Sequence, residues 1–211
     1  MTLILICGYK KTGKDYLCSV LSKIAPRRYG YQILAHPASG LDGEFTSGKY
    51  IHTSFAADLK RQVSEIYGIP LNVPDEEKDV KQYFHPKTNE IVSARDLYKE
   101  WGTIKKNEDE EYWCKAWLNL LGPIDHNATY TITDWRFSYE HPFVLKLFDT
   151  VIRIRVYRSN VDAPPKEDLT ERSLDGVFTD YVAIPEDDED EFEKLVQTFP
   201  QYSEFVKVST I

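Results

Sequence analysis

A short stretch near the amino terminus constrains the fold more than any other part of this 211-residue chain. The apolar run 3–7 (LILIC) leads directly into residues 8–14 (GYKKTGK), which fit the pattern G-x-x-x-x-G-K. This pattern predicts a buried strand, a phosphate-binding loop and the start of a helix. Leu17, Val20, Leu21 and Ile24 then share one helical face, which favours this interpretation over an ordinary glycine turn with solvated lysines.

The residues of this loop have distinct expected roles. Backbone N–H groups converge on an anion, and the following helix adds the positive end of its dipole. Gly13 permits close approach of the backbone, and Lys14 supplies a mobile charge for the outer phosphates. Asp15 stands where Ser or Thr usually holds Mg²⁺, and we expect it to bind the metal directly or through water. The predicted cofactor-binding residues are Gly8, Lys10, Lys11, Thr12, Gly13, Lys14, Asp15 and Tyr16.

Composition and charge narrow the class of protein. The formal net charge is −8, and much of it lies in the C-terminal third, which argues against a nucleic acid polymer or a membrane surface as partner. An anionic substrate stays compatible if positive charge is focused at one site. Three cysteines without close pairs predict reduced thiols, and no segment resembles a signal peptide or a membrane span. We therefore expect a cytoplasmic protein.

Apolar spacing predicts the remaining elements. We expect strands at 129–133, 150–157 and 181–184, and helices at 54–67, from 93, at 110–121 and at about 190–199. Strands that alternate with helices predict an α/β fold with a parallel sheet flanked by helices. The stretch 26–53 is expected to be irregular, with His36 and His52 as ordinary loop histidines, and 70–92 is left unassigned.

Details of three helices follow from the same spacing. Ser93 is the expected N-cap of one helix, with Asp96 in the capping-box position. In the helix at 54–67, Ile66 is expected to face inward with its apolar neighbours. In the helix at 110–121, Leu120 is grouped with Trp113, Ala116, Trp117 and Leu121, and the aromatic stripe is interpreted as core.

Several segments together resemble one enzyme family. The variant G-x-x-x-x-G-K-D, which ends at Asp15, is similar to the deoxynucleoside monophosphate kinases of large DNA viruses and phages, and to the related animal phosphomevalonate kinases. Further segments resemble motifs of this family in the same order: 55–60 (FAADLK), 95–98 (RDLY), 101–103 (WGT), 133–137 (TDWRF) with Glu140, 154–158 (IRVYR) and 170–175 (TERSLD). The resemblance covers roughly residues 3–184.

The resemblance implies a fold and a reaction. The fold is a P-loop nucleoside monophosphate kinase-like domain over residues 1–211, with a lid at about 158–172 and an acceptor-binding helical region at about 54–121. The reaction is γ-phosphoryl transfer from ATP, with Mg²⁺, to a deoxynucleoside monophosphate in deoxynucleotide biosynthesis. The partners are small-molecule nucleotides, the location is the host cytoplasm if the protein is viral, and a homodimer stays open.

Site residues follow from these segments. The predicted catalytic residues are Lys14, Asp134, Arg158 and Arg172, and the predicted metal ligands are Asp15 and Asp134. The predicted substrate-binding residues are Asp58, Lys60, Arg95, Arg136 and Glu140, where Glu140 either orients Arg136 or contacts the acceptor. Some of these residues have a simpler alternative: a solvated surface pair for the charges near residue 60, a helix cap for Asp134 and solvated loop arginines for the lid.

Three other functions stay open at this point. A phosphomevalonate kinase would use the same chemistry on an isoprenoid acceptor, and a non-catalytic binding protein would keep the fold without turnover. A nucleotide-binding switch is disfavoured, because the chain has neither the D-x-x-G nor the N-K-x-D motif of a GTPase.

Overall fold

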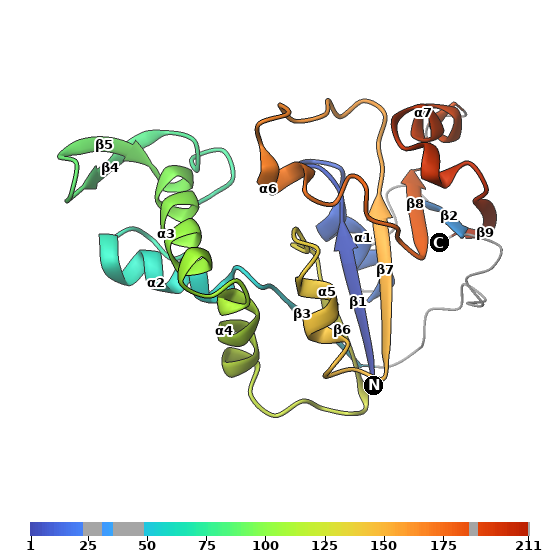
Figure 1. The fold of residues 1–211 in the computed structure, drawn as a ribbon, viewed down its shortest axis with the longest axis horizontal. Coiled ribbons are helices and arrows are strands. Elements are labelled where there is room, and N and C mark those ends of the chain that lie inside the picture. Colours follow the sequence, from blue (N-terminus) through green and yellow to red (C-terminus); the bar gives the residue numbers. More distant parts are fainter. Residues whose placement is uncertain (23–30, 36–48, 186–189, 211) are drawn as a thin grey trace. The chain divides into compact units, whose positions relative to one another are not determined.

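A computed structural model describes residues 1–22, 31–35, 49–185 and 190–210. The chain divides into two compact units, which we call the sheet unit (Met1–Thr53 with Asp125–Ile211) and the helical unit (Ser54–Ile124). The helical unit spans nearly the same residues as the expected acceptor-binding region. Figure 1 shows the elements of both units.

The described part of the sheet unit is organised around a seven-stranded sheet of order β3-β6-β1-β7-β8-β2-β9. Its strands are β1 (Thr2–Cys7), β2 (Tyr31–Ala35), β3 (Lys49–Thr53), β6 (Ala128–Ile132), β7 (Thr150–Val156), β8 (Tyr181–Pro185) and β9 (Val206–Thr210). β1 is parallel to β6 and β7, β6 to β3 and β7 to β8, whereas β2 is antiparallel to β8 and β9. The predicted α/β class is confirmed, and the sheet, predicted to be parallel, is parallel except around β2.

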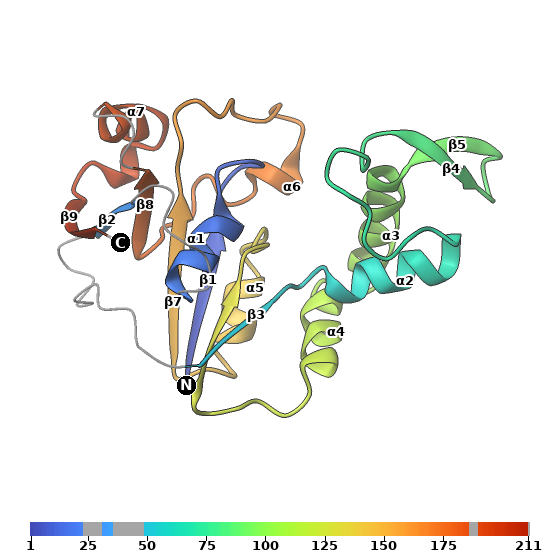
Figure 2. The same cartoon turned by 180° about the vertical axis from the view of Figure 1, so that it is seen from behind.

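Helices cover both faces of this sheet (Figures 1 and 2). α1 (Lys14–Leu21) covers one face, and α5 (Glu140–Val144) and α7 (Glu191–Thr198) cover the other. Ile4 and Ile6 of β1 pack with Leu17 of α1, while Val182 of β8 packs with Leu195 of α7. Burial on both faces explains why β1 is a continuous apolar run. The remaining described helices of the unit are α6 (Leu169–Arg172) and the 3-10 turn η1 (Pro200–Tyr202).

The helical unit contains α2 (Ala57–Tyr67), α3 (Ala94–Glu108), α4 (Tyr112–Leu121) and an antiparallel hairpin, β4 (Lys81–His85) with β5 (Glu90–Ser93). Its core gathers Val63, Ile69, Val73, Ala94 and Leu97. Ser93 and Asp96 form the expected capping box at the start of α3. Trp113 and Trp117 are buried, which confirms their interpretation as core residues.

Some expectations about the elements were wrong. Residues 31–35 and 49–53 form β2 and β3, so 26–53 is not irregular throughout, and His52 lies in a strand. Ile66 and Leu120 are 47% and 55% exposed, because α2 and α4 bury narrower stripes than their sequence spacing suggested. His36 and the acidic residues 186–189 lie outside the described residues. No helix in the described ranges is long and apolar enough to cross a membrane.

Candidate functional site

The loop between β1 and α1 has a backbone shape that its sequence explains. Gly8, Lys11 and Gly13 have positive φ values of 142°, 70° and 97°. A Cβ atom at Gly8 would lie 2.5 Å from the carbonyl oxygen of Val156, so a side chain cannot fit there without displacing backbone. The first glycine of the motif is therefore required by the close approach of β7.

Lys14 folds back over this loop. Its ammonium donates hydrogen bonds of 2.8 Å to the carbonyl oxygens of both Gly8 and Tyr9. Burial lowers the pKa of Lys14, and the nearby Glu171 carboxylate opposes this effect most strongly. Thr12 is buried, and its hydroxyl donates to the Tyr9 carbonyl at 2.9 Å, which braces the turn from inside. The ammonium is thus held beside the loop by carbonyl groups that a phosphate oxygen would replace as acceptors.

The other predicted loop residues surround this turn. Lys10 and Lys11 are exposed, and Tyr16 is half-buried in the first turn of α1, with its ring 6.1 Å from that of Tyr31. The Tyr31 hydroxyl donates to the carbonyl of Gly13 at 3.4 Å. These contacts anchor the carboxyl side of the loop to β2, a strand that was not expected.

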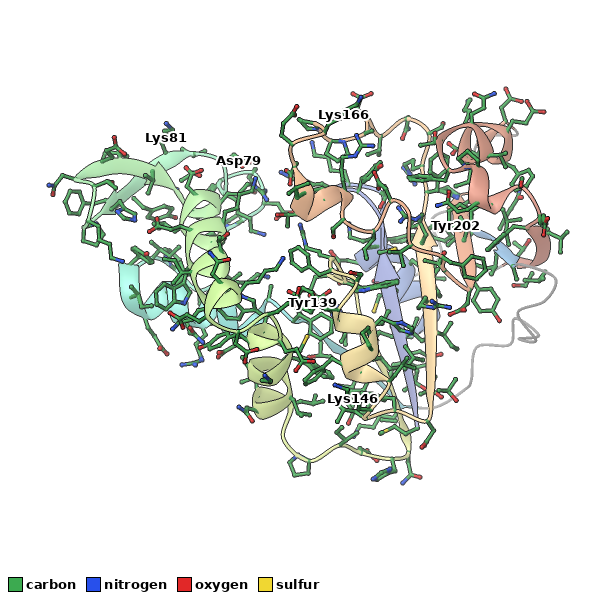
Figure 3. The ribbon with its side chains drawn as sticks, viewed as in Figure 1. Asp79, Lys81, Tyr139, Lys146, Lys166 and Tyr202 are labelled. Atoms are coloured by element: carbon green, nitrogen blue, oxygen red, sulfur yellow. The ribbon has the colours of Figure 1, made fainter. Side chains whose placement is uncertain are left out.

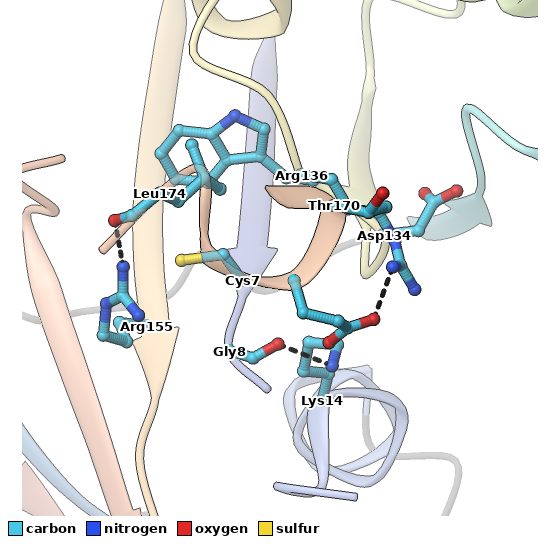
Figure 4. A pocket seen from close by; sticks show the side chains of 10 residues that line it. Cys7, Gly8, Lys14, Asp134, Arg136, Arg155, Thr170 and Leu174 are labelled. Carbon is cyan, nitrogen blue, oxygen red and sulfur yellow. Dashed lines mark hydrogen bonds and ion pairs between the residues drawn. The ribbon is translucent and has the colours of Figure 1, made fainter. Parts of the chain in front are cut away.

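A pocket opens at the loop, and Figure 4 shows the residues that line it. They come from β1 with its loop, the segment after β6, the end of β7 and the α6 region: Cys7, Gly8, Lys14, Asp134, Trp135, Arg136, Arg155, Thr170, Glu171 and Leu174. Four predicted site residues from two distant segments therefore line one pocket: Gly8 and Lys14 from the loop, and Asp134 and Arg136 from the segment after β6. Because β1, β6 and β7 are parallel, their carboxyl ends meet at the edge where ligands bind in open α/β sheets.

A carboxylate lies at the mouth of the loop. Glu171 Oε2 accepts a hydrogen bond of 3.0 Å from the backbone N–H of Lys10, and Oε1 pairs with the Arg136 guanidinium at 2.5 Å. The Glu171 side chain is only 13% exposed. The loop amide and the guanidinium thus bind an anion that the protein itself supplies. Glu171 belongs to the segment 170–175, which resembles a family motif, but the sequence alone assigned it no role.

Glu140 supports the segment that carries Arg136. It is buried, and its Oε2 accepts from the backbone N–H groups of Arg136 and Phe137 at 2.8 and 2.9 Å. Burial is the main cause that raises the pKa of Glu140 to about 8. Of the two roles expected for Glu140, these contacts favour the orientation of Arg136 over direct contact with an acceptor.

Asp15 is tied to the neighbouring strand by a hydroxyl. The Thr133 hydroxyl, one residue beyond β6, donates to Asp15 Oδ1 at 2.5 Å. His52 Nε2 lies 3.1 Å from the same Thr133 oxygen. Because the hydroxyl proton goes to Asp15, the His52 nitrogen is the donor in this second contact. Sequence analysis named the segment 133–137 and His52 but predicted neither contact, since pairings between distant elements have no local signal.

The donor set fits magnesium better than a transition metal. Asp15 and Asp134 offer hard carboxylate oxygens near the loop, and Thr133 connects them, because it bonds to the first and precedes the second. Across the described ranges no group of three or more His, Cys, Asp or Glu side chains gathers around a point. Magnesium is usually held by one or two carboxylates together with phosphates and waters, so this sparse set suits a metal that arrives with a nucleotide.

The two predicted lid arginines have different surroundings. Arg172 donates from Nε to Asp175 Oδ2 at 2.8 Å and from a terminal nitrogen to the Pro164 carbonyl at 3.3 Å, so it ties the two ends of its own segment together. The Tyr9 hydroxyl donates to the other Asp175 oxygen, and burial together with this bond raises the pKa of Tyr9 to about 12. Arg158 is half-buried just after β7 and is not among the residues that line the pocket.

Arg155 is a buried cation that the sequence did not single out. It is 2% exposed, its Nε donates to the Tyr202 hydroxyl at 3.1 Å, and another nitrogen donates to the Leu174 carbonyl. Its guanidinium also lies 4.6 Å from the ring centre of Phe199. Figure 3 shows Tyr202 in the C-terminal part of the sheet unit. Arg155 therefore holds the segment after α6 against this part of the core.

The remaining substrate candidates lie in the helical unit. Asp58 is buried, and its carboxylate accepts hydrogen bonds from Arg61 and Gln62 at 2.7 and 2.6 Å within α2, so a substrate would have to compete with these partners. Lys60 is half-buried on α2. Arg95 pairs with Asp79, which precedes β4 (Figure 3), so an acceptor would have to displace that carboxylate.

Comparison with known proteins does not identify a family for the chain. No protein-family model matches the chain, and no curated protein matches it significantly. Function is therefore inferred from the loop, the pocket and their chemistry.

Proposed function

We propose that the protein is a P-loop nucleoside monophosphate kinase-like phosphotransferase. In this proposal it transfers the γ-phosphoryl group of ATP, bound with Mg²⁺, to the phosphate of a deoxynucleoside monophosphate. The products are ADP and the deoxynucleoside diphosphate. It acts in the cytoplasm on small-molecule nucleotides.

One observation supports the proposal most: the Lys14 ammonium and the Arg136 guanidinium line one pocket, and the Lys10 backbone N–H of the loop donates to the Glu171 carboxylate in its lining. Lys14, Gly8 and Arg136 line that pocket at the carboxyl edge of a mostly parallel sheet. Converging amides and a helix N-terminus favour an anion, and a lysine with a neighbouring arginine favours a highly charged one such as a polyphosphate.

The chain's own groups have clear tasks in this reaction. The Lys14 ammonium exchanges its two carbonyl acceptors for phosphate oxygens, and the Arg136 guanidinium exchanges the Glu171 carboxylate for a phosphate. Asp15 and Asp134 would hold Mg²⁺, which neutralises charge on the phosphates when it is bound. The acceptor phosphate is already anionic, so positioning and charge neutralisation suffice without a strong general base.

The acceptor side depends on the helical unit. Lys60 and Arg95 are the proposed contacts to the acceptor phosphate, through a point charge and a bidentate fork respectively. We propose a nucleotide acceptor on the strength of the resemblance across residues 3–184.

A coupled ADP-release assay tests this proposal. Mg-ATP is supplied with a panel of deoxynucleoside monophosphates, ribonucleoside monophosphates and phosphomevalonate. We expect turnover with at least one deoxynucleotide and a loss of about 10²-fold or more in Lys14→Ala, the scale seen when one preorganised charge-stabilising donor is removed. Lys146→Ala, an exposed lysine of the same unit, is the matched control and should keep full activity.

Two results would contradict the proposal. Turnover with phosphomevalonate alone would show that the proposed acceptor is wrong, although the phosphoryl-transfer reaction would be retained. Absence of ADP release across the whole panel, in a protein that binds ATP equally well with and without Lys14, would remove the phosphotransferase assignment.

A further inference from the structure

We propose that Thr133 is a positioning residue for magnesium: its hydroxyl, one residue beyond β6, holds the Asp15 carboxylate that stands where the loop usually has a hydroxyl ligand. This inference rests on the proposed function and names a residue that no motif assigned. In the common form of the loop, a Ser or Thr after the lysine contacts Mg²⁺ through its side-chain oxygen. Here Asp15 occupies that place, and the Thr133 hydroxyl donates to its carboxylate.

The contact is short and its direction is fixed. Thr133 is 6% exposed, and its hydroxyl donates to Asp15 Oδ1 at 2.5 Å. Asp15 itself is exposed in the first turn of α1, next to Lys14. A carboxylate in this situation would otherwise rotate freely in solvent. A hydrogen bond to one oxygen fixes the plane of the group and leaves the second oxygen available to a cation.

His52 extends the arrangement. Its Nε2 lies 3.1 Å from the Thr133 oxygen, so the imidazole donates to the hydroxyl and the hydroxyl donates to Asp15. The three residues come from β3, the end of β6 and α1, which are distant along the chain. Such a chain turns the hydroxyl proton toward the carboxylate. Hydrogen-bond partners outside the ligand sphere of a metal have this effect on the ligands they contact.

The same two elements provide an internal comparison. Thr131 lies two residues earlier on β6 and therefore on the same face of the strand, and its hydroxyl lies 3.1 Å from the Cys18 thiol of α1. Thr131 is fully buried, and its partner is neutral. Both threonines fasten α1 to β6, but only Thr133 contacts a charged group beside the phosphate-binding lysine. If Thr133 had only a structural role, replacement of either threonine would have the same effect on magnesium binding.

The experiment measures how much magnesium the protein needs to bind a nucleotide. The full-length chain is titrated with ATP by calorimetry, first in EDTA and then over a range of MgCl₂ concentrations. The variants are Thr133→Val, which removes the hydroxyl at similar volume, Thr133→Ser, which retains it, and Thr131→Val, the matched control. Thr133→Ala serves the same purpose as Thr133→Val if the branched replacement does not fold.

We expect Thr133→Val to raise the magnesium concentration for half-maximal tightening by about tenfold, the lower end of the range for loss of such a partner. Its ATP affinity in EDTA should stay within about twofold of the parent. Thr133→Ser should restore the parental magnesium requirement, and Thr131→Val should not change it. Thermal unfolding of the two valine variants should be similar, because both lose one hydroxyl contact between the same elements.

Other outcomes would overturn the inference. Equal magnesium requirements in Thr133→Val and Thr131→Val would show that Thr133 has only a packing role. This result would not affect the proposed nucleotide site. A parent protein that binds ATP without any dependence on magnesium would overturn both the positioning role and the proposed function.

Discussion

The buried carboxyl of Glu140 leads to a prediction about the pH dependence of stability. Burial raises the pKa of Glu140 from 4.5 to about 8. Below pH 4.5 the group is protonated in both the folded and the unfolded state, so it has no effect on stability. As the pH rises from 4.5 to about 8, the unfolded state releases the proton first, and the free energy of unfolding falls.

The size of the effect follows from the same values. Each pKa unit corresponds to about 1.4 kcal/mol, so the rise from 4.5 to about 8 corresponds to about 5 kcal/mol once the pH exceeds 8. Relaxation and water entry around the ionised group reduce this figure, and we expect at least about 2 kcal/mol to be measurable. The neutral amide of Glu140→Gln keeps an oxygen that can accept from the Arg136 and Phe137 N–H groups.

Urea unfolding at pH 5 and at pH 8.5 provides the measurement. Glu140→Gln should match the parent closely at pH 5 and exceed its stability by at least about 2 kcal/mol at pH 8.5. Glu193→Gln, an exposed residue on α7, should show no such gain. A difference between Glu140→Gln and the parent that is the same at both pH values would show that the carboxyl ionises normally in the folded protein, and would refute the reasoning.

Two further predictions concern the loop. Gly8→Ala should lower the free energy of unfolding in urea by at least about 2 kcal/mol, because a Cβ there would lie 2.5 Å from the Val156 carbonyl oxygen and the residue has a φ of 142°. Gly176→Ala, which has open space around its Cβ, is the control. Equal losses of stability in the two variants would contradict the steric argument. Glu171→Gln should tighten ATP binding by about tenfold in calorimetry, because it weakens an internal competitor for the loop. Glu167→Gln, at an exposed position of the same segment, should leave the affinity unchanged. An unaltered ATP affinity in Glu171→Gln would show that this carboxylate does not compete with the nucleotide.

The parts of the fold with strong local signals were predictable. Residues 3–21 have a buried strand, a glycine loop and an amphipathic helix in immediate succession, so each element supports the interpretation of the next. α3 was predictable at its start, because Ser93 and Asp96 form their capping box within four residues of chain. These are local features, and their energetics do not depend on distant partners.

The strands β2 and β3 were missed for the opposite reason. Each has five residues, and each is stabilised by a partner far along the chain, β8 and β9 for the first and β6 for the second. The flanking segments are rich in Gly, Pro and Ser, which predict loops. Only the completed sheet makes these short segments favourable as strands.

The site shows the same division. The loop and Lys14 could be predicted because the spacing of the two glycines and the lysine in the motif determines the shape of the loop and the place of the lysine. The pairings of Asp15 with Thr133, 118 positions apart, and of Arg136 with Glu171, 35 positions apart, are created by the packing of separate elements. The Arg172 guanidinium pairs with Asp175, three positions away, a local contact that the sequence analysis did not predict.

The most direct measurement of the central claim follows the backbone amides of the loop while ATP is added. In two-dimensional amide NMR spectra, we expect saturable shifts of Gly8, Gly13 and Lys14, with the largest changes when magnesium is present. Gly68, which ends α2 in the helical unit, serves as a reference amide and should move least. Saturable ATP binding without any shift of the loop amides would show that the nucleotide phosphates bind elsewhere, and would contradict the proposed function at its foundation.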